Sequence, residues 1–297
     1  MNRQTKSFVV PAAVVAGLLL SAVPRSALAE NKQSSSHRVA ASSKATAPQA
    51  AADVNPTFEI TPNVGWRYFN WKEFSPTGVE QLTESGSLFV FGFDPKVAFG
   101  SGKRFFVEAP TNLYLGKVDY DGALLNGTPY KSQTGYFGFE LAPTAGYVFS
   151  LGSRFQLTPT AGLAFEHWSR DLDDGGRNGY VENYAVYLIH AGIRGNYRLN
   201  RDVSFQSKFG LKVPMAISES VGLGQRGQGQ PLDVSLSPGI SPAFLIEGGS
   251  TIHGFDVALY FETWTLAKSA ADARGFFQPD STRKLFGIRV GHAFGFN

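Results

Sequence analysis

The stretch that decides the fold is the C-terminal segment 285-LFGIRVGHAFGFN-297. Its apolar residues recur at every second position, and the positions between them carry mainly glycine or arginine. The apolar set is Phe286, Ile288, Val290, Phe294 and Phe296, and the intervening set is Gly287, Arg289, Gly291 and Gly295. Successive side chains of a β-strand point to opposite faces of the sheet. The segment is therefore predicted to be a strand with one apolar face and one face of glycine and arginine.

The same alternation runs through the chain from Thr57 onward. In 58-FEITPNVGWRY-68, Glu59 and Arg67 fall on the polar face, and Phe58 and Trp66 fall on the apolar face. A hydrophobic period of two predicts half-buried strands. Similar segments lie near 88–99, 104–116, 135–149, 154–168, 183–199, 203–218, 235–253, 255–267 and 283–296. We predict an all-β protein of about ten strands, within a range of roughly eight to twelve.

The connections between these segments are of two kinds. Short turns are expected near residues 100, 152, 201 and 253, and they alternate with longer loops rich in Gly, Asp, Ser, Asn and Pro. The expected loops are roughly 73–86, 120–133, 171–182, 219–234 and 268–282. Alternating short and long connections predict an up-and-down meander with two unlike ends.

Two architectures fit such a meander. A soluble lipocalin-like barrel has an apolar interior, whereas a membrane barrel has an apolar exterior and a polar interior. Here the apolar face is rich in phenylalanine and nearly free of charge, so it would promote aggregation if it were exposed to water. In lipid a closed sheet satisfies every backbone N–H and C=O group. We therefore predict a transmembrane antiparallel β-barrel with short periplasmic turns and longer extracellular loops.

The face opposite the apolar one carries many ionisable residues, which we predict to line the lumen. The predicted lumenal set is Glu59, Arg67, Asp94, Lys96, Arg104, Glu108, Glu140, Arg154, Glu166, His190, Arg194, Lys208, Lys212, Glu247, Asp256, Glu262 and Arg289. Acids and bases are balanced in this set, and a barrel of about eight strands is just filled by its side chains. Because an unpaired buried charge costs several kcal/mol, we expect a mostly occluded lumen of ion pairs.

The C-terminal segment resembles the assembly signal of Gram-negative outer-membrane barrels. That signal runs polar, any, Gly, any, any, aromatic, any, aromatic, and Arg289, Gly291, Phe294 and Phe296 match it in order. The chain departs from the pattern by ending on Asn297 instead of an aromatic residue. A barrel of about ten strands is similar to the omptin proteases and the Opc-type adhesins. The resemblance implies outer-membrane lipid, lipopolysaccharide and the barrel-assembly machinery as partners.

The first residues of the chain have the parts of a secretory signal. Basic residues precede a mostly apolar run over 8–23, and Ala27-Leu28-Ala29 supplies the small residues of a cleavage site. This pattern predicts a signal peptide over 1–29 and a location in the outer membrane. A membrane anchor is the alternative, but the run is short for a span and Pro11 interrupts it.

The remaining sequence divides into a linker and the barrel. Residues 30–56 are rich in Ala, Ser and Gln with little to bury, which predicts a disordered periplasmic linker, and 57–297 is assigned to the barrel. The chain has a net charge of +3, and residues 1–29 hold three basic residues and no acid. Removal of the signal would leave a net charge of zero, so no nucleic-acid partner is expected.

Neither a cofactor nor a metal centre is predicted. The chain has no cysteine, so it has neither disulfides nor thiolate sites. The segment 170-RDLDDGGRNG-179 is similar to an EF-hand calcium loop, because Glu182 is the twelfth residue counted from Asp171. An EF-hand also needs two flanking helices, which are not expected here. It is interpreted first as an acidic surface loop.

Three functions are considered from the sequence. The first is a structural or surface-interaction scaffold that meets partners through its extracellular loops, including Glu73, Glu80 and Glu84 of the first loop. The second is a narrow, porin-like channel for ions or small solutes. The third is an enzyme at the outer rim, which is disfavoured because Asp171 and Asp173 have no histidine in a partner loop. His190 is interpreted as a structural residue of the lumen.

Overall fold

The computed structural model of the chain describes residues 57–123, 127–173, 179–222 and 233–296. These residues belong to one compact unit, Ala51–Asn297. The predicted signal peptide (1–29) and linker (30–56) lie outside the described residues. No helix in the described part of the chain has the length and hydropathy needed to cross a bilayer.

The described residues are almost entirely β-structure. The strands are β1 Thr57–Phe74, β2 Glu80–Phe99, β3 Phe105–Glu108, β4 Thr111–Ala123, β5 Pro129–Leu141, β6 Thr144–Tyr147, β7 Phe149–Leu151, β8 Phe155–Asp173, β9 Tyr180–Arg198, β10 Val203–Gly222, β11 Asp233–Leu236, β12 Gly239–Ile240, β13 Ala243–Ile252, β14 Phe255–Ala267, β15 Asp280–His292 and β16 Phe294–Phe296. One 3-10 turn, Ser101–Lys103, follows β2. Short breaks that contain Pro110, Pro143, Pro238 or Pro242 separate several short strands from their longer neighbours, as expected because proline cannot donate to the ladder.

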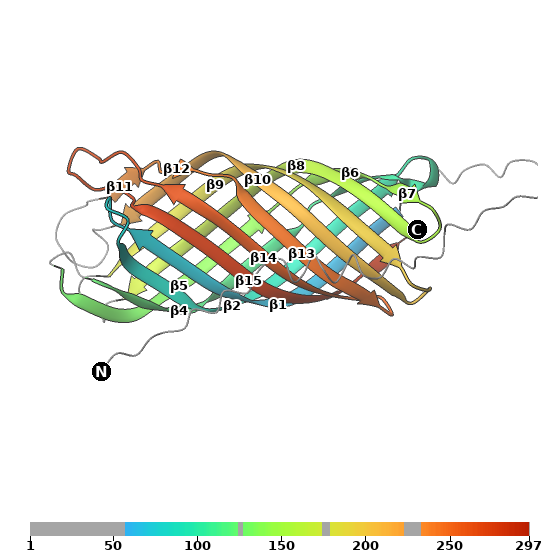
Figure 1. Cartoon of the computed structure of the whole chain (residues 1–297), viewed down its shortest axis with the longest axis horizontal. Helices are drawn as coiled ribbons and strands as arrows, with labels where there is room; N and C mark the ends of the chain where they lie inside the picture. Colours follow the sequence, from blue (N-terminus) through green and yellow to red (C-terminus); the bar gives the residue numbers. More distant parts are fainter. Residues whose placement is uncertain (1–56, 124–126, 174–178, 223–232, 297) are drawn as a thin grey trace, which may run out of the picture. The chain divides into compact units, whose positions relative to one another are not determined.

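The strands close into a ring of antiparallel neighbours (Figure 1). Around the ring the long strands follow the order β1, β15, β14, β13, β10, β9, β8, β5, β4, β2 and back to β1. The first and last long strands close it, with Trp66 opposite Ile288 and Phe74 opposite Asp280. The prediction of an up-and-down barrel of about ten strands is confirmed. We call the end that carries turns 100–104, 152–154, 199–202 and 253–254 the turn end, and the opposite end the loop end.

The outer face carries a belt of exposed apolar side chains in the half of the barrel nearer the turn end. The belt includes Phe89, Phe91, Phe93, Leu113, Leu115, Phe137, Leu163, Ile189, Ile193, Phe205, Phe209, Met215, Leu259, Phe286 and Ile288. A face of this composition suits lipid, and β1 closes the ring by pairing with both β2 and β15. This apolar belt marks the membrane-spanning segments.

The strands continue past the apolar belt toward the loop end. There the inner face of the sheet becomes apolar and the outer face becomes polar. On β1, Phe69 and Trp71 are buried inside, and Asn70 and Lys72 lie on the outer face. On β2, Leu88 is buried inside. Serine and threonine occupy the outer positions of this part of β2. The loop-end extension of the barrel is therefore apolar inside and polar outside, as in a water-exposed barrel.

The loops are consequently shorter than the sequence pattern predicts. The first predicted loop, 73–86, is reduced to 75–79, because β1 reaches Phe74 and β2 starts at Glu80. The second, third and fifth also lose residues to β4, β5, β8, β9 and β15. The fourth predicted loop, 219–234, lies largely outside the described residues.

A bulge in β10 changes which residues face the interior. Pro214 lies opposite Leu188 and Ala216 lies opposite Tyr187, so Met215 is the extra residue. Before the bulge Lys212 is buried, and after it Glu219 is buried. Because one extra residue reverses the alternation of the strand, Glu219 points inward.

Candidate functional site

The interior nearest the turn end forms a charged chamber that is partly open to solvent. Arg194 donates to Glu108, with Nη1 2.9 Å from Oε2. Arg289 Nη2 donates to Glu247 Oε1 at 2.7 Å. Lys208 lies opposite Arg194 on one neighbouring strand and opposite Glu247 on the other. The side chains of Arg194 and Arg289 retain about a third of their exposure, 30% and 33%. We call this zone the turn-side chamber.

Other predicted lumenal residues also lie in or beside this chamber. Asn63 donates to Asp94 at 3.3 Å. Lys96 Nζ lies 3.6 Å from Glu59 Oε1, and both side chains are partly exposed. The hydroxyl of Thr251 donates to Asp256. These contacts are local pairs at the mouth of the chamber.

The middle of the lumen is crossed by a buried ion cluster. Arg283 donates from Nη1 and Nη2 to the two oxygens of Glu166, both at 2.8 Å, and from Nη2 to Glu262 at 3.1 Å. Lys212 Nζ donates to Glu262 at 2.6 Å and to Glu140 at 2.7 Å. We call these residues the central ion cluster. It joins five strands, β5, β8, β10, β14 and β15, across the barrel.

Arg67 lies next to the central ion cluster and contacts an aromatic ring. Its guanidinium carbon lies 3.6 Å from the centroid of Tyr114, a cation–π geometry. The hydroxyl of Tyr114 donates to Glu166 at 2.9 Å. The ring therefore connects Arg67 to the cluster.

Above the cluster, toward the loop end, the interior is filled by large buried side chains. Trp168 and Tyr184 stack with ring centroids 4.6 Å apart at an interplanar angle of 9°. Trp264 meets Trp168 edge-on at 5.7 Å and has the Arg283 guanidinium 3.9 Å from its centroid. Trp71, Trp168 and Tyr184 are at most 2% exposed. We call this packed zone, with the acids and the arginine described next, the loop-side plug.

One arginine in the plug is surrounded by carboxylates. Arg170 donates to Glu84 at 2.9 Å, to Glu73 at 3.0 Å and to Glu182 at 2.7 Å. Glu84 also accepts from the hydroxyls of Thr134 and Tyr136. Because Arg170 and Glu84 are fully buried, removal of one partner would leave an uncompensated charge.

The connection 268–279 packs over this end of the interior. Gln278 and Ser269 are buried, and the backbone N–H of Gln278 donates to Ser269 Oγ at 2.9 Å. With its amide nitrogen directed inward, Gln278 donates to Glu219 at 3.1 Å and to the Tyr184 hydroxyl at 3.2 Å. In this orientation the amide oxygen accepts from the hydroxyl of Ser281 at 2.9 Å. The hydroxyl of Tyr184 in turn donates to Glu182 at 3.0 Å.

Glu219 lies beyond Met215, the last exposed apolar residue of β10, and therefore outside the membrane-spanning segment. Burial and the carboxylates of Glu182 and Glu73 raise the pKa of Glu219 to about 9, against the opposing effect of Arg170. The carboxyl group of Glu219 is therefore expected to hold its proton at neutral pH.

Two predicted lumenal residues belong to turns instead. Arg104 and Arg154 are exposed and precede the first residues of β3 and β8, Phe105 and Phe155. Their carbonyl oxygens still accept hydrogen bonds from the backbone N–H groups of Val148 and Arg198, but their side chains are exposed. Their assignment to the lumen is wrong, because they lie at the mouth where the barrel ends.

Three acids expected in or beside loops belong to the interior. Glu73, Glu84 and Glu182 contact Arg170 inside the barrel. The calcium-loop interpretation of Glu182 is therefore wrong, because its carboxylate is held by Arg170. The rest of that motif, 174–178 and the side chain of Asp173, lies outside the described residues. Glu80 is exposed and pairs with Lys72 at the rim.

The sequence pattern missed the plug residues Arg170, Glu219 and Gln278 and the cluster residue Arg283. The signal for the two arginines was an arginine two positions after Trp168 and an arginine near the start of the last long strand. The predicted lumenal set contains only the charged positions that alternate with the residues of the apolar belt, and these four residues lie outside that set. Within the described residues, no cluster of three or more His, Asp or Glu side chains suits a metal ion.

None of the four described histidines contacts an acid at the loop end. His190 is buried, and neither ring nitrogen has a hydrogen-bond partner. His167 contacts the ring of Phe139. His253 lies in a turn, 3.9 Å from Asp202, and His292 packs against Phe255.

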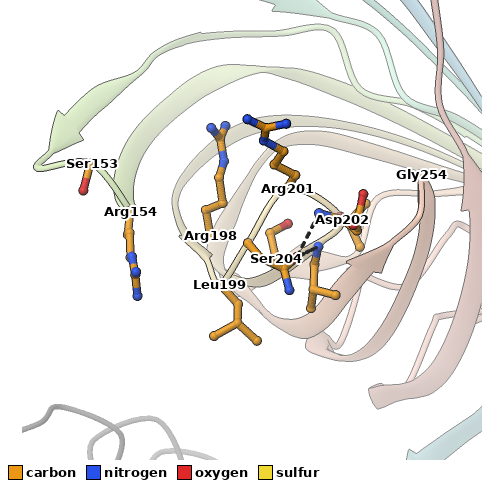
Figure 2. Close-up of a pocket in the computed structure, with 11 residues that line it drawn as sticks. Ser153, Arg154, Arg198, Leu199, Arg201, Asp202, Ser204 and Gly254 are labelled. Carbon is orange, nitrogen blue, oxygen red and sulfur yellow. Dashed lines mark hydrogen bonds between the residues drawn. The ribbon is translucent and has the colours of Figure 1, made fainter.

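The turn end carries a hollow lined by arginines (Figure 2). It has a volume of about 860 Å³, and its lining includes Arg154, Arg198, Arg201 and Asp202. The side chain of Asn200 accepts hydrogen bonds from the backbone N–H groups of Asp202 and Val203, both at 2.8 Å. Such an Asx turn fixes the local backbone.

Comparison with known proteins finds structural likeness without sequence likeness. No known protein family and no curated protein matches the chain. The outer membrane protease OmpT from Escherichia coli superposes with a TM-score of 0.57 at 9% identity, covering 82% of this chain and 97% of OmpT. A major outer membrane protein from Thermus thermophilus matches with a TM-score of 0.40 at 14% identity, covering 78% of this chain and 99% of that one.

The translocator domain of the autotransporter NalP from Neisseria meningitidis matches with a TM-score of 0.39 at 11% identity, covering 78% of this chain and 88% of that domain. At these identities a likeness concerns the fold alone, and the match to OmpT extends over nearly all of both barrels. Together with the closed ring and its apolar belt, the match shows that this chain has the fold of the outer-membrane β-barrel proteins.

Proposed function

We propose that this protein is an outer-membrane scaffold with a closed lumen, which meets partners at the cell surface through its loop-end extension. The observation that carries the proposal is the loop-side plug. Trp71, Trp168 and Tyr184 fill the interior there, and Arg170 and Glu84 are fully buried among them. We expect side chains packed in this way to block the passage of a solute.

The outer surface of the extension is suited to protein or lipopolysaccharide partners. It is polar and of mixed charge, with Lys117, Asp119 and Lys284 among its exposed residues. Lys131 pairs with Asp121 at 2.7 Å on the same surface. Because the extension is built on paired strands, it presents these side chains from a rigid support.

Planar-bilayer recording tests the closed lumen. We expect the wild-type protein to give no discrete openings, and W71A/W168A to conduct because the substitutions remove two large aromatic side chains from the plug. The control Y187A removes an exposed aromatic side chain from the outer face and should remain silent. Reproducible openings of the wild-type protein would contradict the proposal.

A narrow channel is the second candidate, and the turn-side chamber favours it. Arg194, Arg289 and Lys96 are partly exposed there, so ions can enter this half of the lumen. Passage would require the plug to open, which the bilayer recording also measures.

The surface role depends on the orientation of the barrel, which labelling can test. The chain has no cysteine, so single cysteines can be introduced at Thr77 in the first loop and at Ser153 in a turn. On intact cells we expect an impermeant maleimide to label T77C but not S153C. The reverse pattern would place the loop end in the periplasm and overturn the scaffold proposal.

Catalysis at the rim is not proposed, although OmpT is a protease. Asp119 and Asp121 have the spacing of a paired acid, but their side chains lie on the outer face of β4, because Tyr120 between them is buried. The described histidines lie elsewhere. No constellation of a base and a paired acid is therefore formed by the residues that the structure describes.

A further inference from the structure

The turn end of the barrel is strongly biased toward positive charge. Its described turns carry Lys103, Arg104, Arg154 and Arg201, and Arg198 ends β9 beside them. Asp202 is the only acid in these described turns, and it lies 3.9 Å from His253. The acids at the neighbouring strand ends, Glu59 and Asp256, contact Lys96 and Thr251 at the mouth of the chamber. The loop end, by contrast, mixes both signs. Charge of one sign at one end indicates a partner of the opposite sign.

Three of these arginines line the same hollow. The backbone N–H of Arg198 donates to the carbonyl oxygen of Arg154 at 2.7 Å, so the two residues lie directly beside each other on neighbouring strands. Arg201 follows in the turn that Asn200 fixes. In Figure 2, Arg198 and Arg201 extend to the same side, and Arg154 extends to the other. None of the three forms an ion pair with a described acid.

The arginines lie where the apolar belt ends. Leu199, 47% exposed, lies between Arg198 and Arg201 in the sequence and lines the hollow. Leu151 and Tyr197, both exposed, are close to Arg154 and Arg198 in the chain. A site with apolar side chains on one side and cations on the other matches the boundary between acyl chains and headgroups.

We propose that Arg198 and Arg201 bind the headgroup phosphate of an anionic phospholipid in the leaflet that faces the turn end, and that Arg154, which extends to the other side of the same hollow, adds to its positive charge. Guanidinium groups bind phosphate through paired N–H donors. Leu199 would contact the first carbons of the acyl chains, which a free anion lacks. The inference rests on the membrane placement of the proposed function, and an anion would also relieve the mutual repulsion of the three cations.

Native mass spectrometry of the protein purified from membranes tests the assignment. The protein is titrated with dimyristoyl phosphatidylglycerol or with the zwitterionic dimyristoyl phosphatidylcholine in mixed micelles. We expect preferential retention of phosphatidylglycerol, and a loss of at least tenfold in that preference for R154Q/R198Q/R201Q, since each basic side chain at an anionic surface contributes on the order of fivefold.

The matched control is K117Q/K131Q/K284Q, which removes the same charge from exposed positions of the loop-end extension. It should retain the wild-type preference. If the triple arginine variant fails to fold, R201Q alone, in an exposed turn, should still lose about fivefold.

Three results would overturn the assignment. They are equal retention of the two lipids by the wild-type protein, an unchanged preference in the arginine variants, and displacement of the lipid by millimolar inorganic phosphate, which would indicate a free-anion site. The bilayer recording separates this inference from the proposed function. Conduction by the wild-type protein would reject the closed lumen and leave the lipid preference untouched.

Discussion

Glycine in these strands makes room for tyrosine on the neighbouring strand. A Cβ atom added at Gly287 would lie 2.4 Å from Cζ of Tyr260, which is opposite it in the ladder. Gly138 and Tyr114 form a second pair with the same separation. Gly287 of the C-terminal strand is therefore required by packing inside the barrel, and not by turn geometry.

The substitution G287A is expected to destabilise the barrel by about 1–3 kcal/mol, the usual range for overpacking. Gly295, in the same tail, has no atom within 4 Å of an added Cβ, so G295A is the matched control. Urea unfolding in lipid vesicles measures both. Equal midpoints for the two variants would show that the contact with Tyr260 relaxes without cost.

Arg283 offers a comparison between a buried and an exposed ion pair. The substitution R283A should cost about 3–5 kcal/mol, because Glu166 and Glu262 would lose their buried partner. Lys131 and Asp121 are 77% and 62% exposed, so K131A should change the unfolding free energy by less than about 1 kcal/mol. The same urea titration tests the ordering, and a larger effect of K131A would contradict it.

At the scale of the strand, the bulge at Met215 allows one element to serve two environments. Below it β10 directs Lys212 to the lumen, and above it the strand directs Glu219 to the plug. Without the extra residue the upper part of β10 would turn Ser218 and Ser220 inward. The bulge therefore sets which side chains complete the plug.

Deletion of Met215 is expected to disrupt the loop-end extension while the apolar belt still inserts. Protease digestion of the protein in vesicles should then cleave the extension and leave a protected membrane fragment. The control M215A keeps the bulge and removes only an exposed side chain, so it should resist cleavage like the wild type. Resistance of the deletion variant would show that the register can adjust elsewhere.

For the molecule as a whole, the plug contains more acid than base. Among the residues that the structure describes, Glu73, Glu84 and Glu182 pair with Arg170, and the same arginine is the base that acts on Glu219. A buried group of this composition cannot be fully ionised without a large cost. The stability of the extension should therefore depend on pH through a bound proton.

Glu219 gives the sign of this dependence. Its pKa rises from 4.5 to about 9 because of burial and the carboxylates of Glu182 and Glu73, opposed by Arg170. The folded protein then holds a proton that the unfolded chain releases. The stabilisation from this proton is complete below the pKa of the unfolded chain, 4.5, and is lost as pH rises through the pKa of the folded protein, about 9. Wild-type urea midpoints should fall between about pH 5 and about pH 9.

The variant E219Q should flatten this decline, since glutamine cannot release the proton. E80Q is the control, because Glu80 is exposed at the rim, and it should retain the wild-type slope. A decline of equal steepness in E219Q would assign the dependence to another group.

The strands and the closed ring follow from alternation, because lipid on one side and water or ions on the other force a period of two. For this reason the alternation correctly assigns the neighbours Ile288 and Arg289 to opposite faces of the sheet. The loop-end extension has the same period in the opposite phase, with Trp71 inside and Lys72 outside. The ends of the strands, with the plug acids that they carry, were therefore wrongly predicted to lie in loops.

Ionic partners were beyond the reach of the sequence pattern. Alternation gives the face of Arg170 but not its neighbours, and Glu84 lies 86 positions away on a strand that meets it only through closure of the ring. The bulge at Met215 adds a reversal whose local mark is Pro214, because proline within a strand is confined to edges and bulges, but the pattern of alternation does not give its position. The face to which a side chain points is set by its own strand, whereas its ionic partner is set by the arrangement of the whole barrel.

The even number of long strands has a practical consequence. Thr57 and Phe296 leave the ring at the same end, where β16 pairs with the start of β1. A domain joined directly to Thr57 or Phe296 would be carried on that side, and cargo for display must instead be inserted into a connection at the far side. The segment 75–79 is the compact site for such an insertion, since it joins two fully paired strands.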